Sequence, residues 1–133
     1  SATTLVAVGD TGAQTWLVTS NSALTNGSSV VFTDVTATAT TTVVTTVANV
    51  YTFHHTAVCG LDNSTFRVVR GRYTAASHTG TAYNFEFSPQ SPITRGSSLT
   101  VEDADFNTTG AYARTFEMRT ACPLTDSTIE FRN

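Results

Sequence analysis

Apolar and polar residues alternate along most of the chain, in short runs rich in Val, Thr, Phe and Tyr. Gly, Asn, Ser and Pro separate the runs. Because branching at Cβ suits a pleated, half-buried surface, the runs predict strands. The predicted strands are TLVAV, TWLVT, SVVFTDV, TVVTTV, NVYTFHHTAV, TFRVVRGRY, AYNFEFS, SSLTVEDA, AYARTFEMR and STIEFRN. No apolar stripe at helical spacing accompanies them, so the sequence predicts an all-β sandwich or barrel.

The segment TATATTTVVTTV, residues 36–47, has low complexity and could be mistaken for a linker. Its valines and its high strand propensity favour a strand or a pair of strands instead.

Composition narrows the class of protein. The chain has 133 residues, which predicts a single domain over 1–133 with one core. Hydrophobic residues make up 40% and charged residues only 13%, with no lysine, and Ser and Thr supply most of the polar surface. This composition is typical of a β-rich extracellular module.

Charge and hydropathy exclude two kinds of partner. The formal charge of −3 and the pI near 5.4 disfavour nucleic acid, since phosphate binding needs clustered Lys and Arg. Only Arg67, Arg70 and Arg72 lie close together in sequence, and alternation predicts that they point to both faces of one strand. No apolar run approaches the ~20 residues of a membrane span, so a membrane is expected only through segments outside this chain.

Modification signals favour an oxidising, extracellular or cell-surface location. The sequons begin at Asn26, Asn63 and Asn107 and are candidate glycosylation sites. The two cysteines, Cys59 and Cys122, allow one pairing. A bridge would close a loop of about 63 residues and contribute about 4 kcal/mol by chain entropy; two free thiols are the alternative.

The stretch LTVEDADFNTTGAYARTFEMR has the spacing Leu99-x-Val101, then Gly110-x-Tyr112. It resembles the E–F corner of a V-type immunoglobulin domain. The resemblance implies that Leu99 and Val101 point into the core, that Gly110 permits the turn, and that the Tyr112 hydroxyl ties the loop to backbone. Arg114 stands where the family has a cysteine, which implies a domain without the usual disulfide between the sheets.

Spacing backward from Tyr112 places the other strands of the resemblance. Strands B, C, C′, E, F and G are expected near 49–57, 65–72, 81–88, 97–104, 111–120 and 126–132. In this register Cys59 and Cys122 lie in loops at one end of the sandwich, so the resemblance implies a loop-to-loop bridge. Residues 1–28 then form an extension or extra hairpin. The expected fold is a two-sheet antiparallel β-sandwich, immunoglobulin V-type-like, with extra N-terminal strands.

No catalytic or metal-binding group of residues stands out, and no cofactor is expected. His54 and His55 are neighbours on a predicted strand and point to opposite faces, so both cannot bind one metal ion. Glu102, Asp103 and Asp105 are predicted to form a solvated turn. No nucleophile motif or phosphate-binding loop occurs, so we expect a protein that is not an enzyme.

Two hypotheses for function follow. The first is a cell-surface recognition or adhesion domain that binds another protein, including a second copy of itself, through the C–C′–F–G face; here the resemblance extends to allorecognition receptors of colonial cnidarians. The residues expected on that face are Phe66, Val68, Arg70, Tyr83, Phe85 and Arg119. The second is a carbohydrate-binding or host-attachment β domain, lectin-like or of a viral or fungal surface protein, for which Trp16 is a candidate sugar platform.

Overall fold

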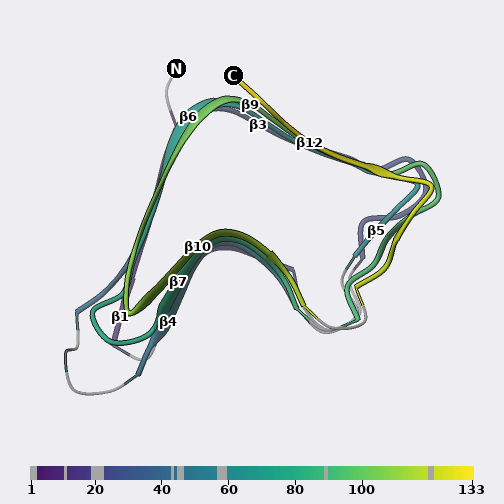
Figure 1. Ribbon diagram of the computed structural model, residues 1–133. Coiled ribbons are helices and arrows are strands. Elements are labelled where there is room, and N and C mark those ends of the chain that lie inside the picture. The colour runs from purple at the N-terminus through teal and green to yellow at the C-terminus, as the bar shows by residue number, and fades with distance from the viewer. Residues whose placement is uncertain are drawn as a thin grey trace.

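The chain winds as a parallel β-solenoid of about four turns (Figure 1). This computed structural model describes residues 3–10, 12–18, 23–42, 44, 47–56, 60–88, 90–119 and 122–133. Each turn passes through three sheets in the same order, here named A, B and C, and each strand pairs with the strand one turn away.

The sheets differ in length and shape. Sheet A contains β1 (Thr3–Gly9), β3 (Ser29–Thr41), β6 (Thr65–Ala76), β9 (Ser98–Thr109) and β12 (Thr128–Arg132). Sheet B contains β2 (Gly12–Val18), β4 (Asn49–His55), β7 (Thr81–Phe87) and β10 (Tyr112–Met118). Sheet C contains the short strands β5 (Leu61–Asp62), β8 (Ile93–Thr94) and β11 (Leu124–Thr125).

The predicted antiparallel immunoglobulin sandwich is wrong, and so is the receptor family that it implied. All strand pairs among the described residues are parallel. TLVAV and TWLVT do not form a hairpin, because the first lies in sheet A and the second begins within sheet B. Most strands of sheets A and B lie close to where alternation predicts them. The predicted strand TVVTTV is not confirmed, because its described residues Thr42, Val44 and Val47 lie outside strands, and the short strands of sheet C were not predicted. Alternation has the same period in parallel and antiparallel strands, so it could not reveal which strands pair.

A repeated turn precedes sheet A and sets the register. The aligned segments are Thr25–Ser29, Asp62–Thr65, Thr94–Ser98 and Thr125–Thr128. Their second residues, Asn26, Asn63, Arg95 and Asp126, all have φ between 48° and 56°. Two of the segments add a glycine with positive φ, Gly27 and Gly96, and these turns are one residue longer. Asn and Asp are the non-glycine residues that adopt this left-handed conformation most readily, so the sequence encodes the turn.

The interior is wide at one end of the cross-section and narrow at the other. The wide end holds aromatic side chains from successive turns, including Phe53 stacked on Phe85 with ring centroids 4.5 Å apart. The narrow end is filled by small residues: Ala13, Ala39, Val50, Ala75 and Ala82. Strands one turn apart lie about 4.8 Å from each other, so like side chains stack in rows along the solenoid.

Candidate functional site

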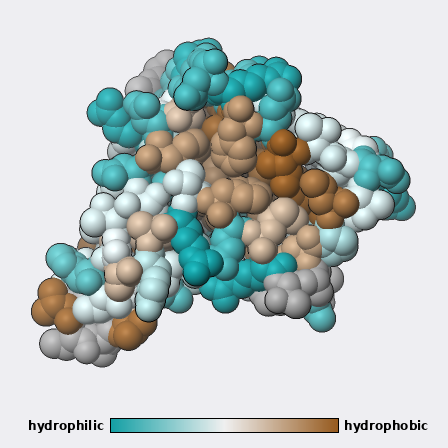
Figure 2. All heavy atoms as spheres, viewed as in Figure 1, coloured by the Kyte–Doolittle hydropathy of each residue, from teal (hydrophilic) through white to brown (hydrophobic). Residues whose placement is uncertain are grey.

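The outer face of sheet B is concave. Figure 1 shows β4, β7 and β10 bowing toward sheet A in the middle of their length, and Figure 2 shows hydrophilic residues lining the hollow between the two lobes on that side. The residues at the bend are Thr15, Thr52, Asn84 and Thr115, which interrupt the regular pairing of the strands. Sheet B therefore offers a recessed surface that sheet A lacks.

Polar side chains hold this bend from the inside. The Thr15 hydroxyl donates to the Thr52 carbonyl (2.7 Å), and the Thr52 hydroxyl donates to the Asn84 carbonyl (2.7 Å). The Asn84 amide, which is fully buried, donates to the Asn107 carbonyl across the interior (3.2 Å). These bonds satisfy polar groups that burial would otherwise leave costly, and they tie sheet B to β9.

Stacked rings form the base of the concave face. Tyr51 and Tyr83, on neighbouring turns, lie parallel with centroids 5.0 Å apart. The His54 ring stacks on Tyr51 at 4.0 Å. Both tyrosines are buried, at 8% and 3% exposure, so they present edges rather than faces to an incoming ligand.

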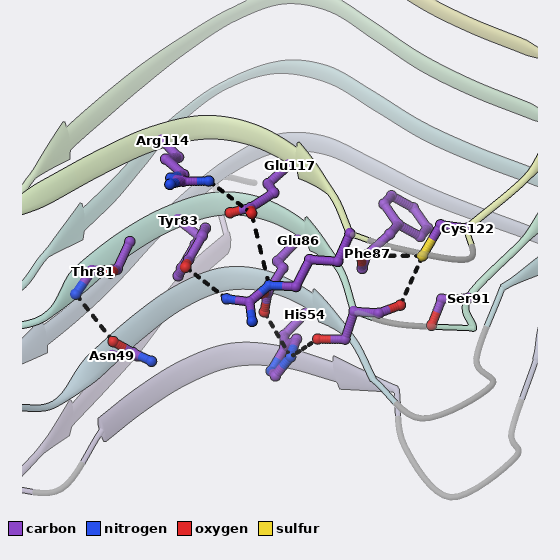
Figure 3. A network of polar contacts seen from close by, with 12 residues as sticks. Asn49, His54, Thr81, Tyr83, Glu86, Phe87, Ser91, Arg114, Glu117 and Cys122 are labelled. Carbon is purple, nitrogen blue, oxygen red and sulfur yellow. Dashed lines mark hydrogen bonds and ion pairs between the residues drawn. The ribbon is translucent and has the colours of Figure 1, made fainter.

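A carboxylate lies buried beside these rings (Figure 3). Glu86 is 1% exposed and contacts His54, with Oε2 2.9 Å from Nε2. Its Oε1 pairs with Nε of Arg119, which follows β10. Arg119 also donates to the Tyr83 hydroxyl (2.8 Å) and lies over the Tyr83 ring. The arginine thus covers a negative charge that would be expensive to bury alone.

A second ion pair sits at the rim. Arg114 Nη1 lies 2.7 Å from Glu117 Oε1, and the Arg114 side chain is about half exposed. The four charged groups on this face, two arginines and two glutamates, balance one another.

Burial changes the acidity of the face. It raises the pKa of Tyr51 to about 12, and the negative charge of Glu86 adds to the shift. The Tyr51 phenol is therefore a neutral donor at all physiological pH values.

The geometry does not provide a relay for nucleophilic catalysis. The Ser88 hydroxyl and the Glu86 carboxylate both approach Nε2 of His54, at 3.1 and 2.9 Å. A relay needs the acid and the nucleophile on opposite ring nitrogens, and here Nδ1 faces Gln14 Oε1 at 3.1 Å. Among the described residues no group of three His, Cys, Asp or Glu side chains could hold a metal ion, and no pocket is found.

The residues predicted to form one protein-binding face are divided by the solenoid. Phe66, Val68 and Phe85 are buried in the interior, at 0–1% exposure. Arg70 lies on the outside of sheet A, where its φ of 47° turns it to the same side as Arg67 and Arg72, so the prediction that these arginines point to both faces is wrong. Only Tyr83 and Arg119 are brought together, on the concave face.

The residues expected to form the immunoglobulin-like corner lie in different parts of the structure. Leu99 and Val101 point into the core, as expected, but they stack on Phe66 and Val68 of a parallel neighbour. Tyr112 is 68% exposed on β10 and ties no loop, while Gly110 stands at the bend between β9 and β10.

Other predicted residues take different places. Glu102, Asp103 and Asp105 lie within β9 rather than in a turn, and Glu102 pairs with Arg67 at 2.6 Å. His54 and His55 do point to opposite sides: His55 stacks on Phe87 inside the core. Trp16 is partly buried and packs against Phe32 of the core, and its role as a sugar platform stays a prediction.

The modification sites stay predictions. Asn26, Asn63 and Asn107 are all exposed, the first two at the repeated turn and the third on the outside of β9. Cys59 lies outside the described residues, so its bridge to Cys122 is untested. The Cys122 thiol lies 2.9 Å from the Ser88 carbonyl.

Sequence reasoning missed the grouping of His54, Glu86 and Arg119. The signal was the turn motif, which recurs four times and aligns β4 with β7 and β10. Once aligned, NVYTFHH and TAYNFEF place Tyr51 on Tyr83 and His54 beside Glu86.

No helix long and apolar enough to cross a membrane occurs among the described residues. No family model, no curated protein and no solved structure matches this chain.

Proposed function

We propose that this chain is an extracellular recognition module that binds uncharged carbohydrate on the concave outer face of sheet B. One observation carries the proposal: the three neighbouring strands β4, β7 and β10, with Arg119 directly after β10, bring stacked tyrosines, a histidine and two balanced Arg–Glu pairs to a single recessed surface.

Sugar hydroxyls both donate and accept hydrogen bonds, and this surface offers both roles at short range. Arg114, Arg119 and Tyr51 donate, while Glu117 and Gln14 accept. Because the charges on the face balance, neutral glycans fit better than sulfated or sialylated ones.

Outward-facing side chains form rows along the solenoid axis, and these rows would orient a bound ligand. Tyr51 and Tyr83 follow one another along the solenoid axis, as do His54 and Glu86. A linear oligosaccharide lying along this axis would meet different groups at successive turns, since the two rows run Gln14, Tyr51, Tyr83, Arg114 and Leu17, His54, Glu86, Glu117. The exposed sequon asparagines support an extracellular location, since they are accessible for glycosylation.

A glycan array probed with the purified chain tests the proposal. Binding to a neutral glycan should weaken by about tenfold or more in Arg114→Ala, which removes an exposed charged donor at the rim. The matched control is Arg72→Ala, because Arg72 is more exposed and its ion pair on sheet A is longer, at 3.9 Å.

An array without signal, or binding that Arg114→Ala leaves intact, would contradict the carbohydrate proposal. Capture of a protein ligand that competes with no glycan would instead favour the first hypothesis, protein recognition.

A further inference from the structure

His54 has an oxygen acceptor at each of its two ring nitrogens. Nδ1 lies 3.1 Å from the side-chain oxygen Oε1 of Gln14. Nε2 lies 2.9 Å from Oε2 of Glu86, with the Ser88 hydroxyl at 3.1 Å, and Figure 3 shows the ring beside this carboxylate. A neutral imidazole carries one N–H and can donate to only one of two acceptors. The contacts in this structure therefore fit the imidazolium, which donates at both nitrogens.

A neutral His54 ring requires the Gln14 amide to turn over. Loss of one proton leaves one ring nitrogen bare, and that nitrogen then needs a donor. The remaining N–H is favoured at Nε2, because the Glu86 carboxylate is a stronger acceptor than an amide oxygen. Nδ1 becomes the acceptor, and Gln14 satisfies it by presenting its NH2 group in place of Oε1. This exchange needs a half-turn of the amide, for which the exposed side chain of Gln14 has room.

The orientation of the Gln14 amide decides what this residue offers to a ligand. Gln14 stands next to Tyr51 in the outward row that also contains Tyr83 and Arg114. While the ring is charged, Oε1 is bonded to it and the NH2 group turns away from it, so Gln14 adds a donor to this row. While the ring is neutral, Oε1 turns away and Gln14 accepts, which is the role that the proposed function gives it.

Protonation of His54 also changes the net charge of the concave face. Arg114 and Arg119 balance Glu86 and Glu117 while the ring is neutral, and the imidazolium adds one positive charge. His54 is 9% exposed, so water screens this charge less than it would screen an exposed one. An added cation and an added donor both favour a ligand group that is anionic and only accepts hydrogen bonds. A carboxylate is such a group.

The titratable and charged neighbours of His54 come from several elements. Glu86 of β7 contacts the ring directly, and Arg119, after β10, reaches it only through Glu86. Tyr51 of β4 stacks on the ring and keeps its proton, because burial raises its pKa to about 12. On β2, the group in contact is the uncharged amide of Gln14. Imidazole is the side chain that ordinarily changes charge between pH 5 and 8, so we assign the change of state to His54.

We propose that protonation of His54 changes the ligand class of the concave face, from neutral glycans when the ring is neutral to carboxylate-bearing glycans when it is charged. The proton acts in two ways that reinforce each other. It turns the donor end of the Gln14 amide toward the ligand, and it leaves the face with one net positive charge. This inference rests on the carbohydrate proposal, because it assigns a regulation to that same surface.

Binding at two pH values tests the ligand class on the intact chain. The probes are pairs of oligosaccharides that differ only in a uronic-acid carboxylate in place of a hydroxymethyl group, measured by calorimetry at about pH 5.5 and about pH 7.5. The ratio of the affinity for the carboxylate-bearing probe to that for the neutral probe should be about fivefold or more higher at the acidic pH. In His54→Gln, which is uncharged at both pH values, this ratio should change by less than about twofold. The control His78→Gln removes an exposed histidine outside the strands and should keep the wild-type response.

NMR of the ring nitrogens in the wild-type chain tests the change of state without a ligand. Both nitrogens of His54 should carry protons at acidic pH, and the neutral ring should keep its proton on Nε2. The side-chain NH2 signals of Gln14 should move with the same midpoint. A neutral ring that keeps its proton on Nδ1 would overturn the inference, since Gln14 would then have no reason to turn over.

The binding experiment separates this inference from the carbohydrate proposal. A preference between the paired probes that is the same at both pH values, while neutral glycans still bind, would overturn the role of His54 and leave the carbohydrate proposal standing. A response to pH that persists in His54→Gln would overturn it in the same way. Absence of binding by every glycan at both pH values would overturn both proposals.

Discussion

The outer faces of sheets A and B carry the same kinds of ion pair in opposite surroundings. On sheet A, Arg70 holds Asp34 with two hydrogen bonds (2.8 and 3.0 Å), yet both side chains are more than half exposed. On sheet B, Glu86 is 1% exposed and its partner Arg119 is 38% exposed. The bend of sheet B excludes water from the carboxylate, while sheet A leaves its charges in solvent. An Arg–carboxylate ion pair therefore matters for the free energy of folding on sheet B and hardly at all on sheet A.

The pKa shifts also differ between the two sheets. The hydrogen bond from Arg70 lowers the pKa of the Asp34 carboxyl, and that side chain is about half exposed. On sheet B, burial instead raises the pKa of Tyr51, and it does so without a direct ionic partner.

The largest test of this comparison removes one arginine from each face. Arg119→Ala should lower the free energy of unfolding by about 3 kcal/mol, because it leaves a buried carboxylate without its main partner. Arg70→Ala should produce no separable change, since Asp34 then faces water. Urea unfolding at pH 7 measures both. Equal losses would mean that the concave face does not shield Glu86, and recovery in Arg119→Leu with Glu86→Leu would confirm the cause.

The bend itself is tested at Asn84. Asn84→Ala should cost about 2 kcal/mol, because the Asn107 carbonyl and the Thr108 hydroxyl lose the buried Asn84 amide that donates to them. Thr115 is the next of the four bend residues and is exposed. Thr115→Ala is therefore the control and should change the free energy of unfolding little. Near-ultraviolet circular dichroism of the tyrosines should change only in Asn84→Ala. If the tyrosine signal is the same in both variants, the polar row does not shape the concave face.

The smallest expected effect lies at alkaline pH. Tyr51 has a folded pKa of about 12 against an ordinary value of 10.0, so the fold favours its neutral form. Its contribution is fully present below pH 10 and is lost as pH rises through 12. Wild-type stability should therefore fall across this window by about 1 kcal/mol more than that of Tyr51→Phe. Identical slopes for the two proteins in unfolding experiments at several pH values would contradict the assignment to Tyr51.

Most strands of sheets A and B could be predicted from the sequence, but their partners could not. SVVFTDV, NVYTFHH and TFRVVRGRY all lie in strands, and Leu99 and Val101 point inward as alternation predicts. The parallel pairing could not be predicted because the repeat is hard to recognise in the sequence. The aligned leucine and isoleucine residues of that row lie at unequal intervals, and the repeated turn has different residues at its second position: Asn26, Asn63, Arg95 and Asp126. The immunoglobulin-like spacing around Tyr112 was a chance consequence of a strand, a glycine bend and a second strand.

The candidate site was harder still. Tyr83 and Arg119 could be named as surface candidates, but Glu86 appeared only as one acidic residue in an alternating strand. Nothing local marks it as buried, because its burial depends on an arginine from the next turn and a histidine from the previous one.

The sequence by itself determined most strands of sheets A and B, the side to which residues such as Leu99 and Val101 point, and the left-handed turns at Asn26, Asn63 and Asp126, since these depend on side-chain shape and local backbone preference. The tertiary structure decided which strands pair, where sheet B bends, and which charges lie out of water. These features depend on contacts between residues about one solenoid turn apart, and such contacts exist only after the chain has wound on itself.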